Sequence, residues 1–498
     1  MPSETTSAAP RVEPAAPNLF LTVFPSIMLP MFMAAVDQTI VATALPAIAG
    51  SLGNVERVSW IVVSYLVATT IAAPVYGRLG DALGRKKMMY VALAVFVAAS
   101  VLCAMSRSVL MLTAARLLQG AGGGGLMTLS QALIAEAVPP RQRGKYQGYL
   151  SGMYASAATF GPVAGGYLTQ HFGWHSVFMV NVPLGALATA LVMRLPSNPV
   201  RGGQFRFDVL GTVFFTGFIA PVLLAMERAQ HIDLAAVPMV AALLVIAVVS
   251  LVLLIRQEQR CADPLLPIQL FRQAGIWRTD TMAACVAGQT VALVSFLPMY
   301  LQVVRGATTA HSGVLLLPLT LGVAIGSFCC GRIIAATGRT AILPSIGLTV
   351  SAAMLLSLAA FAPSLSTSTI IGMLALASAC TGTAMPVVQM TVQTVAGPRF
   401  LGAAAASVQF SRSVGASFGT ALVGAVLFAV LTTRDAETAS MFAGIVQRGP
   451  VALEALSAAQ RLVVRDEIAD AFRAAFLTIG CFTTGGMLLA WWLPVRRI

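Results

Sequence analysis

The sequence predicts an all-α polytopic membrane protein with fourteen transmembrane helices and cytoplasmic N- and C-termini. Of its 498 residues, 57% are hydrophobic and only 10% are charged, whereas a soluble globular domain carries about 25% charged residues. The apolar residues gather in runs long enough for a helix to cross a bilayer, which takes about 20 residues. Most of the 31 Lys and Arg residues lie in alternate loops between these runs. Together these observations indicate a multi-pass membrane chain rather than a soluble domain.

The apolar runs set the expected order of the elements. Short loops rich in Arg and Lys stay in the cytoplasm, and an inside N-terminus places most basic loops there. The net charge of +13 is therefore explained by topology. A nucleic-acid partner is not expected, because aromatic residues that could stack on bases are absent from these loops. The fourteen predicted spans lie near 19–46, 58–77, 88–106, 109–135, 146–170, 176–194, 208–227, 234–255, 281–304, 312–336, 340–362, 367–393, 400–431 and 472–493.

An internal repeat divides the chain into domains. The string GRLGDALGRKK, from Gly77 to Lys87, is echoed by GRIIAATGR, from Gly331 to Arg339. The first six spans thus correspond to the last six, and such parallel repeats hold a substrate site at their interface near the bilayer midplane. We expect a disordered cytoplasmic tail (1–18), an N-terminal six-helix bundle (19–194), linkers with two inserted helices (195–280), and a C-terminal six-helix bundle (281–498) with an extracytoplasmic loop (432–471).

Asp37 is the first candidate functional residue. No other residue between Glu13 and Glu56 is formally charged, and Asp37 falls within the first predicted span. A carboxylate near the middle of a membrane helix costs about 2.5 kcal/mol or more, so it is retained where it faces water, a proton or a substrate. We therefore predict that Asp37 carries the coupling proton.

Three strings resemble a known family. The loop from Gly77 to Lys87 resembles the signature of the major facilitator superfamily. The string DQTIVATALP at 37–46, WHSVFMVNVP at 174–183 and the fourteen-span layout resemble the fourteen-span drug:proton antiporter branch of that superfamily. The resemblance implies a fold of two six-helix bundles with two inserted helices. It also implies transport that is powered by a proton gradient and needs no cofactor. We expect the protein to lie in the cytoplasmic (inner) membrane of a bacterium.

Arg116 is a second charge inside a predicted span. The resemblance implies that it lies against the first span, where it bonds backbone carbonyls and tunes Asp37. The alternative is that Arg116 snorkels to the outer interface, because it is only about two turns into its span.

The loop after the second span contains a candidate conformational latch formed by Gly77, Asp81, Gly84 and Arg85. The glycines allow a tight turn, Asp81 can accept hydrogen bonds from a helix N-terminus, and Arg85 can pair with a carboxylate. The resemblance implies that the cluster latches one conformation against the opposite half. The alternative is an ordinary cytoplasmic turn rich in basic residues, which would explain the Arg and Lys residues but not Asp81 or the spacing of the glycines. The second copy has Ala335 in place of the acid, so its latch is in doubt.

The fifth span contains a run of small residues that the resemblance identifies as the antiporter motif. A Pro with neighbouring Gly gives a pliable helix, and small residues let helices approach closely. Ordinary tight packing is the alternative reading. In the resembling family this arrangement marks exchangers. The motif residues are Gly152, Gly161, Pro162, Gly165 and Gly166.

Polar residues in other spans are candidates for the substrate cavity, although interhelical hydrogen bonds would also explain them. No metal site is expected: His171 and His175 have ligand-like spacing but no acid or thiol near them in sequence. No catalytic constellation or nucleotide-binding loop is visible, so the chain is not expected to be an enzyme. The cavity candidates are Tyr65, Gln119, Tyr154, Gln289, Tyr300, Gln389, Gln409 and Arg412.

These features predict alternating access by two rocking bundles. The expected function is proton-coupled antiport that exports lipophilic, cationic drugs or toxic compounds. An exporter of a lipid or endogenous metabolite on the same scaffold is the alternative. The expected partners are protons, a small-molecule substrate and the lipid bilayer. The loop 432–471 could dock a periplasmic adaptor protein or shield the cavity mouth.

Overall fold

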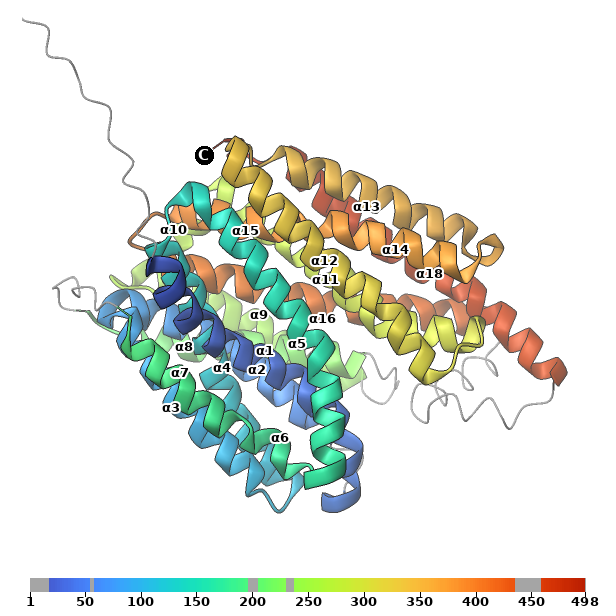
Figure 1. Cartoon of the computed structure of the whole chain (residues 1–498), viewed down its shortest axis with the longest axis horizontal. Helices are drawn as coiled ribbons and strands as arrows, with labels where there is room; N and C mark the ends of the chain where they lie inside the picture. The colour runs from blue at the N-terminus through green and yellow to red at the C-terminus, as the bar shows by residue number, and fades with distance from the viewer. Residues whose placement is uncertain (1–17, 54–57, 196–204, 230–236, 435–457, 498) are drawn as a thin grey trace, which may run out of the picture.

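The structure is a computed structural model that describes residues 18–53, 58–195, 205–229, 237–434 and 458–497. Helices make up most of these ranges, and the only bridge between extended residues in them joins Arg339 to Arg497. Long helices lie side by side in two groups (Figure 1). Residues 1–17 of the predicted tail (1–18) lie outside the described residues. So do residues 435–457 of the loop 432–471, which could dock an adaptor or shield the cavity mouth.

The helices of the N-terminal half follow the predicted order. The sixth predicted span is divided at Val180 into α6 and α7, which places Asn181 at the first position of α7. The helices are α1 (Asn18–Leu52), α2 (Ser59–Leu83), α3 (Arg85–Ala104), α4 (Val109–Ala137), α5 (Pro140–Phe172), α6 (His175–Met179) and α7 (Asn181–Met193).

The C-terminal half repeats this pattern after three connecting helices, α8 (Val209–Ala229), α9 (Val237–Arg260) and α10 (Ile268–Phe271). Residues 458–471, predicted as loop, instead form the start of α18, which continues unbroken into the last predicted span. The helices are α11 (Ala274–Met299) with the π-helix η3 (Tyr300–Val304), α12 (Thr309–Thr337), α13 (Ile342–Phe361), η4 (Ala362–Ser364), α14 (Thr367–Gly382), α15 (Ala384–Ala396), α16 (Leu401–Arg434) and α18 (Ala458–Trp491).

The predicted count of fourteen apolar spans is not supported. Twelve stretches of the described chain are long and apolar enough to cross a membrane. The two predicted spans that miss this standard, 109–135 and 146–170, coincide with α4 and α5. These helices are 29 and 33 residues long, but glycines and polar side chains dilute their apolar character. The lengths of α4 and α5 agree with the predicted spans, whereas their composition is less apolar than that of the twelve other stretches.

Each half has its own apolar core. Side chains of α1, α2, α3, α4, α5 and α7 form one core, with Tyr65, Phe96 and Leu126 fully buried. Side chains of α11 to α18 form the cores of the other half, with Leu355 and Leu374 fully buried. The inserted helix α8 packs on α2, α9 and α16. Only 11% of the apolar window of α9 is buried, so α9 lies at the periphery.

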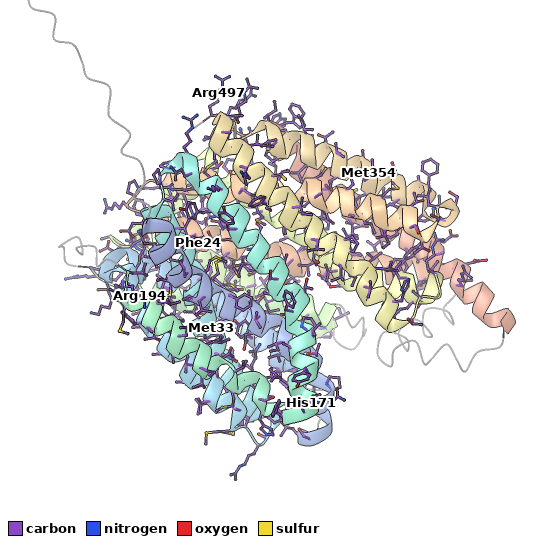
Figure 2. All side chains as sticks on the ribbon, in the orientation of Figure 1. Phe24, Met33, His171, Arg194, Met354 and Arg497 are labelled. Carbon is purple, nitrogen blue, oxygen red and sulfur yellow. The ribbon has the colours of Figure 1, made fainter. Side chains whose placement is uncertain are left out.

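The two halves meet closely at one end, which we call the basic end because it carries Arg85, Lys86 and Arg497. There α2 packs on α16 and α5 packs on α12. Figure 2 shows Arg194 and Arg497 at this end and His171 at the far end of α5. Away from the basic end, α5 and α12 diverge (Figure 1). Which end faces the cytoplasm stays a prediction.

Candidate functional site

The carboxylate of Asp37 is fully buried and bonded by three polar side chains from two other helices. Arg116 of α4 forms an ion pair with one oxygen. Gln119 of α4 and Asn181 of α7 donate to the other oxygen at 2.8 and 3.1 Å. Asp37 has no exposed surface and Arg116 is 1% exposed. A buried ion pair is favourable only when its remaining hydrogen-bonding groups are satisfied, and this cluster supplies the needed bonds.

A second layer orients these partners. The amide of Gln119 also donates to the Ser100 hydroxyl at 2.8 Å, while its oxygen accepts from Arg116 at 2.7 Å. Asn181 donates to the same hydroxyl at 3.3 Å. Sequence reasoning missed Ser100 and Asn181 as site residues. Asn181 lies within the string at 174–183, whereas Ser100 has no distinguishing sequence signal.

Arg116 is anchored inside the protein and does not snorkel to an interface. Its Nε donates to the carbonyl of Ile61 at 3.3 Å, and its guanidinium lies 4.1 Å from the ring centroid of Tyr65. Tyr65 donates to the carbonyl of Ala34 at 3.3 Å. Tyr65 and Gln119, predicted to line the substrate cavity, therefore belong to the Asp37 cluster. In this conformation neither Asp37 nor Arg116 meets solvent.

Arg116→Gln should destabilise the protein by about 3 to 5 kcal/mol, because it leaves the Asp37 carboxylate buried without its cation. Replacing both partners, as Asp37→Asn with Arg116→Gln, should recover most of that loss. Thermal unfolding of purified protein in detergent measures the effect. Arg332→Gln is the control, since Arg332 is an exposed arginine beside the Phe328 ring. An Arg116→Gln variant as stable as the wild type would contradict the assignment.

Asp81 joins the two halves at the basic end. Its carboxylate accepts hydrogen bonds from the backbone N–H groups of Gly402 at 3.0 Å and Ala403 at 3.3 Å, in the first turn of α16. Arg85 binds both Asp81, at 2.7 Å, and Glu136 of α4. An acid at a helix N-terminus also interacts favourably with the helix dipole. The predicted latch residues Asp81 and Arg85 thus contact each other, and Asp81 also contacts the opposite half.

The glycines of this loop have separate roles. Gly84 joins α2 to α3 with φ 98°, a backbone conformation that favours glycine. A Cβ at Gly77 would lie 2.5 Å from the carbonyl oxygen of Gly402, so only glycine allows this contact between α2 and α16. The second copy differs: Ala335 replaces the acid, and Thr340 bonds the backbone of Val495 and Arg496 instead.

The predicted antiporter motif packs α5 against α1 close to Asp37. A Cβ at Gly161 or Gly165 would collide with Thr39 or Thr43 of α1. The Thr39 hydroxyl lies within 3.0 Å of the carbonyl of Ala157 on α5, to which it donates. Pro162 lies inside α5 and is half-buried. By contrast, a Cβ at Gly152 or Gly166 would meet no atom within 4 Å.

Gly165→Ala should lower the unfolding free energy by about 1 to 3 kcal/mol, the usual cost of overpacking. Its new Cβ would lie 2.5 Å from the backbone carbonyl oxygen of Ile40, which cannot rotate away. Gly166→Ala is the matched control, because the same methyl group one residue later has free space. Thermal unfolding of both variants checks this prediction, and equal stabilities would refute it.

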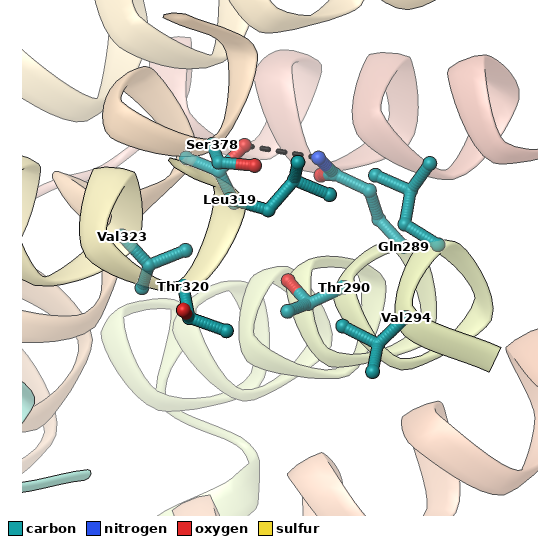
Figure 3. Close-up of a pocket in the computed structure, with 9 residues that line it drawn as sticks. Gln289, Thr290, Val294, Leu319, Thr320, Val323 and Ser378 are labelled. Carbon is teal, nitrogen blue, oxygen red and sulfur yellow. Dashed lines mark hydrogen bonds between the residues drawn. The ribbon is translucent and has the colours of Figure 1, made fainter. Parts of the chain in front are cut away.

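Gln289 occupies in α11 the place that Asp37 occupies in α1. Its amide donates to Thr381 of α14 at 3.0 Å and to Ser351 of α13 at 3.4 Å. These helices correspond in the repeat to α4 and α3, which hold the partners of Asp37. A small cavity of about 30 Å³ adjoins Gln289, lined by Thr290, Leu319 and Thr320 among others (Figure 3). This equivalent cluster in the C-terminal half is neutral.

The other cavity candidates are scattered. Tyr154 of α5 and Arg412 of α16 face each other across the two halves, 5.7 Å from ring centroid to guanidinium. Tyr300 packs between Phe472 and Phe476, inside the core of the C-terminal half. Gln389 is buried on α15 and Gln409 is half-buried on α16. The eight candidates therefore do not form one cavity lining.

Asp280 is a buried carboxylate that sequence reasoning missed. It is 4% exposed near the start of α11, with Ser407 of α16 beside it. The predicted span began one residue later, at 281, which left Asp280 in a linker.

Among the described residues, no group of three or more His, Cys, Asp or Glu could hold a metal ion. His171 and His175 stack separately on Tyr167 and Trp174.

The fold and these motifs agree with a comparison to known protein families. The family described as Major Facilitator Superfamily matches residues 27–420, most of the chain. The chain belongs to the major facilitator superfamily. This protein is therefore a multi-pass membrane transporter and not an enzyme.

Relatives of this major facilitator protein include efflux pumps. It is 32% identical to an uncharacterized MFS-type transporter of Mycobacterium tuberculosis, over 98% of this chain and 71% of the relative. It is 29% identical to the multidrug transporter protein MdtP of Bacillus subtilis, over 80% of this chain and 74% of that one. The human organic anion transporter MFSD10 shares the fold, with TM-score 0.65, 16% identity, and coverage of 94% of this chain and 99% of that one.

Proposed function

We propose that this transporter is a proton-coupled antiporter of the fourteen-span drug:proton branch, exporting lipophilic compounds across the cytoplasmic membrane of a bacterium. The observation that carries the proposal is the buried Asp37–Arg116 pair. A proton on Asp37 removes the carboxylate's charge and with it the main attraction for Arg116. Binding and release of a proton would thus change how α1 and α4 hold together.

The contact at the basic end supports an alternating-access cycle. The halves are joined there by Asp81 with the first turn of α16 and by the Gly77–Gly402 contact. Both contacts involve Gly402, so separating α16 from α2 at that residue would break them together. Switching between two packed arrangements of this kind is the usual basis of transporter cycling. We propose that these residues latch the basic end, and that this end faces the cytoplasm.

We further propose that α4 and α5 cross the membrane with the twelve apolar helices. At about 1.5 Å per residue they exceed the hydrocarbon thickness of about 30 Å. α4 packs against α2 and α3, and α5 packs against α1 and α12. Their polar and glycine positions face these neighbours, as in Gln119, Gly161 and Gly165. Protein contacts would therefore replace lipid around the less apolar surfaces.

The expectation of a cationic substrate rested on a lone carboxylate facing it. Asp37 is instead surrounded by Arg116, Gln119 and Asn181. In this conformation Asp37 is therefore not available to contact a cationic substrate. The charge preference must therefore come from other residues.

Inside-out membrane vesicles test the proposed function. An imposed pH gradient, acidic inside, should drive accumulation of a lipophilic fluorescent compound, and adding that compound should speed decay of the gradient. Nigericin, which collapses the gradient, should stop accumulation. Vesicles without the protein are the control, and labelled phospholipid in place of the compound tests a lipid exporter. Accumulation that persists without any gradient would contradict antiport.

A further inference from the structure

Arg412 places a positive charge at the interface between the two halves. It is half-buried on α16, and its Nε–H group is buried without a hydrogen-bond acceptor among the described residues. Its guanidinium carbon lies 5.7 Å from the ring centroid of Tyr154 on α5. Because α5 and α16 belong to opposite halves, any molecule between the halves at this level meets both side chains.

No carboxylate among the described residues forms an ion pair with Arg412. Asp37 is bound by Arg116, Asp81 by Arg85, and Asp263 by Arg78. Arginine stays charged in proteins, and a charge in the interior of a membrane protein is retained mainly for function. Arg412 thus differs from Arg116, whose positive charge is already balanced.

Arg412 lies just beyond the point where the halves close. α16 touches α2 at Gly402, and Arg412 is ten residues further along, about 15 Å at 1.5 Å per residue. On α5, Gly148 packs directly on Phe328 of α12, but a Cβ at Gly152 would meet no atom within 4 Å. The close contact of α5 with α12 at Gly148 is therefore not repeated at Gly152, two residues before Tyr154. Parallel repeats hold their substrate at such an interface, near the bilayer midplane.

The chemistry of this pair selects for an anion with an apolar body. A guanidinium presents a planar fork of N–H donors that matches a carboxylate or sulfonate. The Tyr154 ring offers a flat apolar surface beside it. A cationic compound would meet only repulsion from Arg412, and Asp37 is too deeply buried to offset it.

We propose that Arg412 binds the acidic group of the exported compound, so that the substrates are amphipathic organic anions with an aromatic or aliphatic body. This inference rests on the proposed export function and names its substrate class. Tyr154 contacts the body of the compound, and Arg412 contacts its carboxylate or sulfonate.

Equilibrium dialysis against purified protein in nanodiscs tests the proposal without any gradient. The probes are two matched series: 2-naphthoate with 2-naphthamide and 2-(aminomethyl)naphthalene, and 2-naphthalenesulfonate with its sulfonamide. The acids should bind about tenfold more tightly than their neutral or cationic partners, as expected for a charge-assisted hydrogen bond. Arg412→Gln should lose that preference, and Arg412→Lys should keep part of it. Arg332→Gln, which removes an exposed arginine beside an aromatic ring, should change nothing.

Two results would overturn the proposal: a wild type that binds no acid more tightly than its amide in either series, or a folded Arg412→Gln variant that binds acids like the wild type. The comparison of acids with their amides in the wild type tests the proposal even if the variants fail to fold. Failure of the proposed antiport would give a different result from failure of anion binding. Acids that bind through Arg412 but whose uptake into vesicles ignores the pH gradient would refute proton coupling alone.

Discussion

Asp37→Asn is expected to reduce gradient-driven uptake into inside-out vesicles to the background level. Asparagine has nearly the shape of aspartate and can still accept from Gln119 or Asn181, but it cannot bind and release a proton near neutral pH. Substrate exchange that needs no net proton movement should persist. The comparison of driven uptake with exchange therefore separates loss of coupling from loss of binding.

The control for this variant is Asp466→Asn, which changes an exposed acid on α18 and should leave uptake unchanged. Asp37→Asn leaves Arg116 without its counter-ion, so the double variant with Arg116→Gln checks that the loss does not come from misfolding. The double variant should be stable and still uncoupled. Normal gradient-driven uptake by a folded Asp37→Asn variant would refute the mechanism.

Gly77→Ala should force the basic end open. The added Cβ would lie 2.5 Å from the carbonyl oxygen of Gly402 and 2.8 Å from its carbon, and backbone atoms cannot turn aside as side chains do. Overpacking of this kind costs about 1 to 3 kcal/mol. Here the cost falls only on the conformation in which α2 touches α16. The conformational equilibrium should therefore shift toward the state in which they separate, and the transport rate should fall.

Spin labels on exposed Lys87 and Arg399, in a background without the native cysteines, report this opening. Double electron–electron resonance should show a longer distance between the labels in Gly77→Ala than in the parent protein. Gly152→Ala, which meets no atom within 4 Å, is the matched control and should leave the distance unchanged. An unaltered distance in Gly77→Ala would show that the helices absorb the methyl group without separating.

Isolated charges made the central residues of the candidate site visible in the sequence. Asp37 and Arg116 each stand alone in an apolar run, and the structure pairs them. Their neutral partners could not be predicted in the same way. Whether Asn181 reaches Asp37, and Ser100 reaches Asn181, depends on the rotation of three helices and on the break at Val180, which hydropathy does not encode.

Other differences between the prediction and the structure arise because counting apolar residues does not show which polar residues a helix buries. The predicted span beginning at 281 excluded Asp280, because a charge next to a run looks like its boundary, yet α11 buries that charge. Gln119 and Tyr65 looked like cavity residues because any polar side chain in a span needs a partner, and the partner is the Asp37 cluster. Conversely, the run of small residues in the fifth span predicts close helix approach, and Gly161 and Gly165 lie tightly against α1.

The neutral cluster around Gln289 bears on the energy that drives each transport cycle. Gln289 cannot exchange a proton, so this site adds nothing to the single proton that Asp37 can take up per cycle. For the proposed exchange of one proton inward for one monovalent anion outward, each unit of pH difference supplies about 1.4 kcal/mol. Two charges move in that exchange, so each 100 mV of membrane potential adds about 4.6 kcal/mol. A chain that duplicates the fold but not the charged cluster would thus draw more on the membrane potential than on the pH difference.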